Sequence, residues 1–309
     1  MMNLARSALL WISENRKLRE TLPRYKFIRR AVTRFMPGEE FSDALSAAQT
    51  LQRQSIKAIF TRLGENVADE QEARAVADHY CSSLKEIARS GLDSYVSVKL
   101  TQLGLDLSDD VCYENLQRIV KEANRSNNWI WIDMEQSSYV DRTLAIYRRI
   151  KSTYPKVGVC LQAYLFRTQK DVEDLLSHKP AIRLVKGAYA EPATIAFPRK
   201  ADVDANFFSL SKFLLEHVRD GVLYGIATHD SVLISRIQWE AQRQGLGKDQ
   251  YEFQLLYGIK TDLQKNLAEE GYLIRSLIAY GSFWFPWYVR RLAERPANVL
   301  FVAKSMLTR

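Results

Sequence analysis

The sequence has little of what marks a secreted, metal-binding or membrane-spanning protein. It contains three cysteines in 309 residues, widely separated and without CxxC or Cys/His spacing. No spacing indicates zinc, and three separate cysteines are typical of a protein from a reducing compartment. The apolar run near the N-terminus is too short for a signal peptide or a membrane span. We therefore expect a cytoplasmic protein without a metal site.

Glycine and proline are also few, with 13 and 8 residues scattered along the chain. No linker, internal repeat or low-complexity tract stands out. With 47% hydrophobic residues, the chain can bury a large core. Its length fits two average domains or one α/β barrel, since such barrels often run to about 250 residues or more.

Acidic residues are nearly absent from one N-terminal segment. Between Arg16 and Arg34 eight Lys or Arg stand against one acid, Glu20, within a chain of formal net charge +8. Two interpretations stay open: a solvated helix face, or a basic amphipathic segment that rests on an anionic membrane surface. Nucleic acid is not expected as a partner, because no recognised binding motif accompanies the charge.

Short β-branched or aromatic runs alternate with helical stretches along most of the chain. Helical patterns occupy about 3–20, 41–54 and 69–90, and the strand candidates are 56–61, 94–100, 129–134, 157–163, 181–187, 221–230, 251–256 and 272–278. This alternation is the signature of repeated βα units. Eight such strands with intervening helices predict a (β/α)8 barrel that follows the N-terminal helical patterns.

Polar side chains fall at the ends of several predicted strands. In such barrels the carboxyl ends of the strands converge on one mouth, where active sites are built. Each side chain alone has a structural explanation, such as a cap or a contact with water. Together they predict a ring of ligand-binding groups, because charges inside apolar strands are otherwise costly. The ring consists of Lys99, Asp133, Gln162, Lys186, Thr228 and His229.

An aromatic stretch around two arginines lies near the C-terminus, in "WFPWYVRRLAERP" at 284–296. A planar guanidinium is a natural fork for a carboxylate. The stretch predicts a helix in which Arg290 and Arg291 bind a small carboxylic acid, with aromatic walls over its apolar part. The structural alternative is an exposed helix in which Glu294 pairs with one of the arginines.

Seven motifs resemble the proline dehydrogenase family in its short bacterial form. They are "SVKLTQLG", "IWIDME", "LQAYLFRT", "IRLVKGAYAEP", "ATHD", "EFQLLYG" and "AYGSFWFPWYVRRLAERPAN", in the family's order from about residue 56 to the end. The resemblance implies an N-terminal helical arm over residues 1–55 and a distorted (β/α)8 TIM barrel over residues 56–309, whose final helix lies over the mouth. It also implies noncovalent FAD and oxidation of proline to Δ1-pyrroline-5-carboxylate, with hydride transfer to flavin N5.

The resemblance also implies roles for individual residues. Asp133 and Arg183 are the expected catalytic pair. The expected substrate contacts are Lys99, Tyr189, Leu256, Arg290 and Arg291. The expected flavin contacts are Met134, Gln162, Arg183, Val185, Lys186, Gly187, Ala188, Lys200, Thr228 and His229.

The spacing of the two cations in "IRLVKG" restricts how both can reach the flavin. Fixed cations such as Arg183 or Lys186 would stabilise the negative charge of reduced flavin near N1. Their odd spacing prevents both from facing inward on a regular strand. We expect the strand end to bend, or one of them to act from the loop.

Two positions depart from the family pattern. Leu277 and Trp287 stand where tyrosines are expected beside the substrate, and Tyr280 and Tyr288 lie near enough in sequence to substitute. The change leaves the carboxylate clamp in place but replaces hydroxyls by apolar bulk. Proline, 4-hydroxyproline and other cyclic imino acids therefore all stay open as substrates.

Two functions of other kinds also stay open. One is a flavin barrel with another donor, such as a methylenetetrahydrofolate reductase-like enzyme. The other is a barrel scaffold that binds an anionic ligand or a membrane without catalysis. For the leading function we expect a membrane quinone as electron acceptor, reached through the basic segment 16–34. A separate pyrroline-5-carboxylate dehydrogenase would take the product, because we expect no second catalytic domain in the chain.

Overall fold

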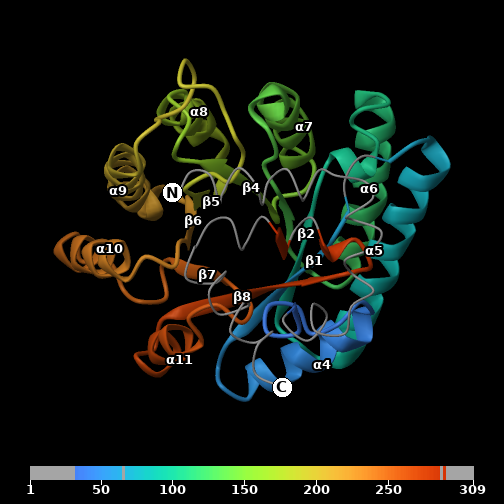
Figure 1. Ribbon diagram of the computed structural model, residues 1–309, viewed down its shortest axis with the longest axis horizontal. Helices are drawn as coiled ribbons and strands as arrows, with labels where there is room; N and C mark the ends of the chain where they lie inside the picture. The colour runs from blue at the N-terminus through green and yellow to red at the C-terminus, as the bar shows by residue number, and fades with distance from the viewer. Residues whose placement is uncertain (1–31, 65–66, 286–287, 290–309) are drawn as a thin grey trace, which may run out of the picture.

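The computed structural model describes residues 32–64, 67–285 and 288–289. In this part of the chain eight parallel strands close into a barrel in sequence order, and β8 pairs with β1. Figure 1 shows helices arranged around these strands. The predicted (β/α)8 barrel is confirmed. The helical pattern at 3–20 and the predicted final helix lie outside the described residues, apart from a few positions up to Val289.

Each predicted strand corresponds to one strand of the barrel. The strands are β1 Lys57–Arg62, β2 Ser94–Val98, β3 Ile130–Ile132, β4 Val157–Gln162, β5 Ala181–Val185, β6 Leu223–Ala227, β7 Glu252–Leu256 and β8 Leu273–Tyr280. The helices are α4 Phe41–Gln52, α5 Glu70–Ser90, α6 Asp109–Arg125, α7 Val140–Lys151, α8 Thr168–Leu175, α9 Lys200–Glu216, α10 Ser231–Arg243 and α11 Thr261–Glu269. Short 3-10 turns lie at η2 Thr101–Leu103, η3 Ser137–Tyr139, η4 Leu176–His178 and η5 Val218–Asp220.

Local sequence signals explain where the helices begin and end. Asp69 caps α5 by accepting a hydrogen bond from the backbone N–H of Glu72 at 2.8 Å, and the helix ends at Gly91, which has a φ of 67°. Asp230 caps α10 by accepting hydrogen bonds from the first-turn N–H groups of Val232 and Leu233. Such caps satisfy N–H groups that lack a partner within the helix.

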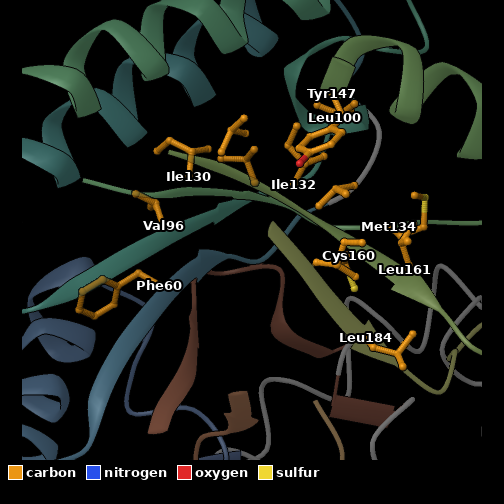
Figure 2. Close-up of a cluster of buried hydrophobic side chains, with 14 of the residues drawn as sticks. Phe60, Val96, Leu100, Ile130, Ile132, Met134, Tyr147, Cys160, Leu161 and Leu184 are labelled. Atoms are coloured by element: carbon orange, nitrogen blue, oxygen red, sulfur yellow. The ribbon is translucent and has the colours of Figure 1, made fainter. Parts of the chain in front are cut away.

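The main core lies between the strands and the helices. Figure 2 shows part of it, with Phe60, Val96, Ile130, Ile132 and Leu184 drawn from four of the strands. Alternate residues of the same strands face the barrel interior, because successive strand side chains point to opposite faces. The interior therefore receives a different and more polar set of side chains, which forms the site.

Helix α4 belongs to the predicted N-terminal arm, yet it shares the core of the barrel. Its Phe41 ring lies 5.1 Å from Phe60 and 5.3 Å from Tyr280, measured between ring centroids. Ala44 and Ala48 are buried in the same cluster. The domain boundary at residues 55 and 56 stays a prediction. In the described part of the chain, no helix has the length and apolar character to cross a membrane.

Candidate active site

A cavity of about 690 Å³ lies at the carboxyl ends of the strands. Its size is in the range of small-molecule and cofactor sites, about 300–1,000 Å³. Every strand of the barrel, or the loop that follows it, contributes to the wall. This is the end of the barrel at which active sites of the fold are found.

The cavity brings the described site residues together. Its wall contains Lys99, Asp133, Met134, Gln162, Arg183, Val185, Lys186, Gly187, Ala188, Tyr189, Lys200, Thr228, His229 and Leu256. Arg290, Arg291 and Trp287 lie outside the described residues. The roles assigned to all of these residues stay predictions.

The two tyrosines that could supply the missing hydroxyls lie away from the described cavity wall. Leu277 lines the cavity. Tyr280 follows it by an odd number of residues and so faces the other side of β8, where its hydroxyl lies 2.9 Å from Nε2 of His79. Tyr288 is buried in a separate cluster with Phe35 and Trp284. Neither tyrosine is among the described residues of the cavity wall.

Arg183 is held in the cavity wall by a compact polar network. Its side chain is 4% exposed; its Nη1 lies 3.3 Å from Oδ1 of Asp133, and its Nη2 donates to Oγ of Ser97 at 2.9 Å. Ser97 in turn donates to Oδ1 of Asp133 at 2.7 Å. The guanidinium lies 4.9 Å from the ring centroid of Trp131. A buried ion pair needs such extra hydrogen bonds to offset its desolvation.

Ser97 and Trp131 were missed as site residues at the sequence level. The signal for both is alternation: each lies two residues before a predicted site residue on its own strand, and therefore faces the same side. Trp131 also needs space from the next strand. A Cβ atom on Gly158 would lie 2.6 Å from the Trp131 ring, so the glycine makes room for the indole.

Two lysines and two aspartates form an ion-pair cluster at the cavity wall. Lys186 lies 2.5 Å from Asp204 and 3.1 Å from Asp230, and Lys200 contacts the same two carboxylates. Partial burial raises the pKa of Asp204 and of Asp230, but hydrogen bonds from Lys186 and further lysine contacts outweigh it, so both pKa values end below their usual range. Both acids were missed at the sequence level, because they lie on a helix and a helix cap far from Lys186 in the chain.

The position at which β5 ends explains how both Arg183 and Lys186 reach the cavity. β5 ends at Val185, so Arg183 faces inward from the strand while Lys186 belongs to the loop. The next residue, Gly187, has a φ of +114°, and a Cβ atom there would lie 2.2 Å from the Tyr164 ring. Glycine is therefore required where this loop crosses the aromatic ring.

Hydrogen bonds between loops hold the cavity wall in shape. The backbone N–H of Tyr164 donates to the carbonyl of Lys186 at 2.9 Å. Glu191 accepts from both the N–H and the hydroxyl of Ser137, at 2.7 and 2.6 Å. These contacts connect the loops after β3, β4 and β5, so the residues that follow Lys186 are fixed from two sides.

His229 connects the ends of β6 and β7. Its Nε2 accepts a hydrogen bond from the backbone N–H of Leu256 at 3.0 Å. An imidazole that accepts at Nε2 carries its proton on Nδ1. His229 therefore has a structural role, because it holds the end of β7. The same ring also lines the cavity.

Several polar atoms of the cavity wall are buried without a hydrogen-bond partner in the described part of the chain. An unpaired buried polar group costs about 1–3 kcal/mol, so a ligand that pairs with these atoms is favoured. Gln162 donates through Nε2 to the carbonyl of Glu135 at 3.1 Å, which leaves its Oε1 unpaired. The unpaired atoms on wall residues include Gln162 Oε1, Arg183 Nε and Gln254 Oε1.

Two of these atoms, on Gln162 and Arg183, fit a large polar ring system that carries both donors and acceptors. The acceptor on Gln162 and the donor on Arg183 lie on the adjacent strands β4 and β5. The isoalloxazine ring of a flavin has such an edge, and Arg183 and Lys186 supply positive charge beside it. Among residues 32–64, 67–285 and 288–289, no group of three or more His, Cys, Asp or Glu is arranged to hold a metal ion.

Comparisons with known proteins agree with this chemistry. A family model described as proline dehydrogenase matches residues 44–304. Proline dehydrogenase 1 of Bacillus subtilis (strain 168) is 38% identical over 304 residues, which cover 98% of this chain and 99% of the relative. The proline dehydrogenase of Deinococcus radiodurans is 38% identical over 309 residues, which cover 98% of each chain.

A solved structure shows the same fold. Proline utilization A from Bdellovibrio bacteriovorus, inactivated by N-propargylglycine, superposes with a TM-score of 0.81 at 24% identity. The match covers 86% of this chain and 33% of that longer chain.

Proposed function

The chain belongs to the proline dehydrogenase family and is an oxidoreductase of proline, and we propose that it forms Δ1-pyrroline-5-carboxylate with noncovalent FAD as hydride acceptor. The observation that carries this proposal is the buried Arg183, fixed in a cavity of cofactor size with its Nε unpaired among the described residues. Membership of this family argues against the two alternative functions, a methylenetetrahydrofolate reductase-like enzyme and a noncatalytic scaffold.

The walls formed by β4, β5 and β6 are the proposed cofactor side. Gln162, Arg183 and His229 would hold the ring system, with Met134, Val185, Lys186, Gly187, Ala188 and Thr228 around it. Lys200, exposed at the rim, would reach the phosphates. When bound, FAD supplies the N5 atom that accepts a hydride from the substrate carbon beside nitrogen.

Arg183 acts in this proposal through its fixed position. Asp133, Ser97 and the Trp131 ring hold the guanidinium before any ligand binds. A cation that is already oriented stabilises negative charge in the site without reorganisation. Asp133 keeps the cation in place and balances its charge, which is the basis for grouping the two as the catalytic pair.

The substrate would lie on the other side of the cavity. Lys99 has no carboxylate partner among the described residues, so it can take the carboxylate of the substrate, together with Arg290 and Arg291. Tyr189 and Leu256 would cover the ring. A fixed carboxylate holds the reacting carbon near its acceptor, a positioning effect of up to about 7–11 kcal/mol in the best cases.

4-Hydroxyproline or another cyclic imino acid is the second candidate substrate. The observation that favours it is Leu277, an apolar side chain on the cavity wall where the family resemblance led us to expect a tyrosine. Without that hydroxyl, the wall has one polar contact fewer with which to distinguish proline from other cyclic imino acids.

One absorption experiment tests the cofactor and the substrate together. The purified protein should be yellow, and its flavin absorbance should bleach when proline is added under anaerobic conditions. Titration with hydroxyproline then measures selectivity. A colourless protein that takes up no FAD on reconstitution would refute the proposal.

We also propose that the protein works in the cytoplasm, at the membrane face, and passes its electrons to a quinone. The basic segment 16–34 lies almost entirely outside the described residues. Support comes from the exposed large hydrophobic side chains. In the described part of the chain, all but Trp239 follow the carboxyl end of a strand, at the end where the cavity lies: Leu107, Phe166, Ile195, Val232 and Phe283.

We propose that a separate pyrroline-5-carboxylate dehydrogenase takes the product.

Co-sedimentation with anionic vesicles tests the membrane proposal. Serine substitutions at Phe166 and Ile195 together should weaken binding by about tenfold, because less apolar surface enters the interface. Trp239→Ser is the matched control, since this exposed side chain lies on the outer face of α10. Equal losses in both variants would contradict a membrane contact at the mouth. No binding of the unmodified protein at low salt would leave segment 16–34 as a solvated surface.

A further inference from the structure

Gln254 lies within the motif "EFQLLYG", but neither the family resemblance nor the proposed function assigns it a role. It lies on β7, two residues before Leu256, and therefore faces the same side about 6.6 Å deeper in the barrel. Its side chain is buried, with 4% of the residue exposed, and it lines the cavity. Its Oε1 has no hydrogen-bond partner in the part of the chain that the structure describes.

The orientation of this amide is fixed by its neighbours. Gln254 Nε2 donates to Oε1 of Glu252, and the other oxygen of Glu252 accepts from Nε of Arg275 at 3.1 Å. An ionised carboxylate can only accept hydrogen bonds. The amide must therefore direct its NH2 group at Glu252, and its carbonyl oxygen away from it. The usual ambiguity between the nitrogen and oxygen of a glutamine is removed by this partner.

The neighbouring strand leaves space for this amide. A Cβ atom on Gly225, on the neighbouring strand β6, would lie 2.8 Å from Gln254 Nε2. The amide thus occupies the space that a side chain at residue 225 would take. Arg275 is anchored in turn, because its Nη1 donates to Oδ1 of Asp93 at 2.9 Å. The Gln254 amide is therefore held by a chain of contacts that runs through the buried Glu252 and Arg275 to the half-exposed Asp93.

The position of this acceptor separates it from the proposed cofactor side. The unpaired atoms of Gln162 and Arg183 lie on β4 and β5, whereas Gln254 lies on β7. The apolar wall residues Leu256 and Leu277 lie on β7 and the neighbouring β8. A ligand on this side needs an apolar body and at least one N–H or O–H group. Among the parts of proline, only the ring nitrogen supplies that donor once the carboxylate is ionised.

We propose that Gln254 is a substrate-binding residue whose side-chain oxygen accepts a hydrogen bond from the ring N–H of the imino acid. This inference rests on the proposed oxidation of proline. The bond is available to the substrate both as an ammonium and as a neutral amine, since each carries an N–H. With the carboxylate held elsewhere, it fixes a second point of the ring and so restricts which face of the ring carbon is presented.

Gln254→Met tests the proposal, because methionine fills similar space without an acceptor oxygen. We expect the KM for proline to rise by about tenfold, the effect of one lost hydrogen bond to a charged group. The dissociation constant for FAD, measured by fluorescence titration, should not change. The inhibition constant of cyclopentanecarboxylate should not change either, since this ligand keeps the ring and the carboxylate but has no N–H. Gln254→Leu repeats the test if the methionine variant does not fold.

Ser276→Ala is the matched control. The Ser276 hydroxyl is also buried and unpaired among the described residues, but it lies between the inward-facing positions 275 and 277 and so faces the surrounding helices. Its loss should leave the KM and the affinity for FAD unchanged. Glu252→Gln is a second probe, because a neutral amide partner allows Gln254 to turn over. In the double variant of Glu252→Gln and Gln254→Met, the KM for proline should then rise by less than the product of the two single rises.

Three results would overturn the proposal. Weaker FAD binding with an unchanged KM assigns the acceptor to the cofactor. Equal rises in the KM for proline and the inhibition constant of cyclopentanecarboxylate show that the wall is merely distorted. An unchanged KM in both Gln254 variants removes the contact altogether. If the unmodified protein binds FAD but does not oxidise proline, the proposed function fails instead, and this is seen before any variant is made.

Discussion

Two arginines inside the barrel, Arg183 and Arg275, have the same burial and different surroundings. Each residue is 3% exposed. The Arg183 guanidinium lies 4.9 Å from the ring centroid of Trp131, and the Arg275 guanidinium lies 3.4 Å from that of Tyr95. Arg275 has a carboxylate at Nε and another at Nη1, from Glu252 and Asp93. Arg183 contacts a single carboxylate, that of Asp133, which also accepts a hydrogen bond from Ser97. The Nε of Arg183 is buried without a partner among the described residues.

The difference follows from where each arginine lies along the barrel. Arg275 is near the start of β8, beside Glu252 at the start of β7, at the end of the barrel opposite the cavity mouth. Arg183 is near the end of β5 and lines the cavity. A buried charge that is paired with carboxylates is costly to disrupt, whereas a buried charge with an unpaired donor is prepared for a ligand. The same residue type therefore serves structure at one end and chemistry at the other.

The largest expected effect is on stability, from Arg275→Met. Removing this cation leaves Glu252 buried with no positive partner among the described residues, and breaking a buried pair in this way costs about 3–5 kcal/mol. Urea denaturation monitored by circular dichroism measures the loss. Arg275→Lys is the control, because it restores the charge without the fork that reaches both acids, and should recover part of the loss. A loss below about 1 kcal/mol would mean that this end of the barrel is not stabilised by the pair.

Arg183→Met should give the opposite pattern, with a large loss of activity and a smaller loss of stability. Removing one fixed electrostatic group from an active site lowers kcat by about 100-fold to 1,000-fold. Asp133 is less deeply buried than Glu252 and keeps the hydrogen bond from Ser97, so its charge stays partly satisfied. Steady-state kinetics and urea denaturation of the same samples provide the two measurements.

Arg183→Lys sharpens this second prediction. Lysine keeps the positive charge but loses the planar contact with Ser97 and Asp133. If charge alone is needed, the variant should recover most of the activity. If the orientation is needed, it should resemble Arg183→Met. Equal stability losses at Arg183 and Arg275, with activity unchanged in both, would break the distinction between the two ends.

The barrel and the location of its site were predictable because both depend on periodicity. The eight strands appear as short apolar runs between helical stretches, and a polar residue at a strand end needs no knowledge of distant contacts. The strand ends were less certain. Residues 181–187 were predicted as one strand, but β5 ends at Val185, and this places Lys186 in the loop.

The partners of the site residues were not predictable in the same way. Ser97 is a single hydroxyl in an apolar strand, and its contact with Arg183 joins residues 86 positions apart. Gln254 has a role only because Glu252 fixes its amide and Gly225 leaves space for it. Such contacts depend on strand register and on which small residue faces which large one. Neither property is visible in a single strand.

The smallest expected effect is at the ion pairs of the cavity rim, where pairing is complete but close to solvent. The pKa of Asp204 in the folded protein lies below its usual value, despite partial burial that raises it, because Lys186 and Lys200 donate to the carboxylate. This stabilisation is therefore present above about pH 4, the usual range of an aspartate, and is lost as the pH falls toward the folded-state pKa. Asp204→Asn should lower stability by about 0.5–1 kcal/mol at neutral pH.

Melting temperatures of the Asp204→Asn variant and the unmodified protein, measured from pH 7 to pH 3, test this prediction. The two curves should converge below about pH 4, because protonation removes the charge that the substitution removes. Asp202→Asn is the control, since Asp202 pairs with the exposed Arg199 at the N-cap of the same helix and should have less effect. A difference that persists at pH 3 would assign the contribution of Asp204 to hydrogen-bond geometry. The rim would then resemble Arg275, which is paired with two carboxylates, more than Arg183, whose Nε is unpaired among the described residues.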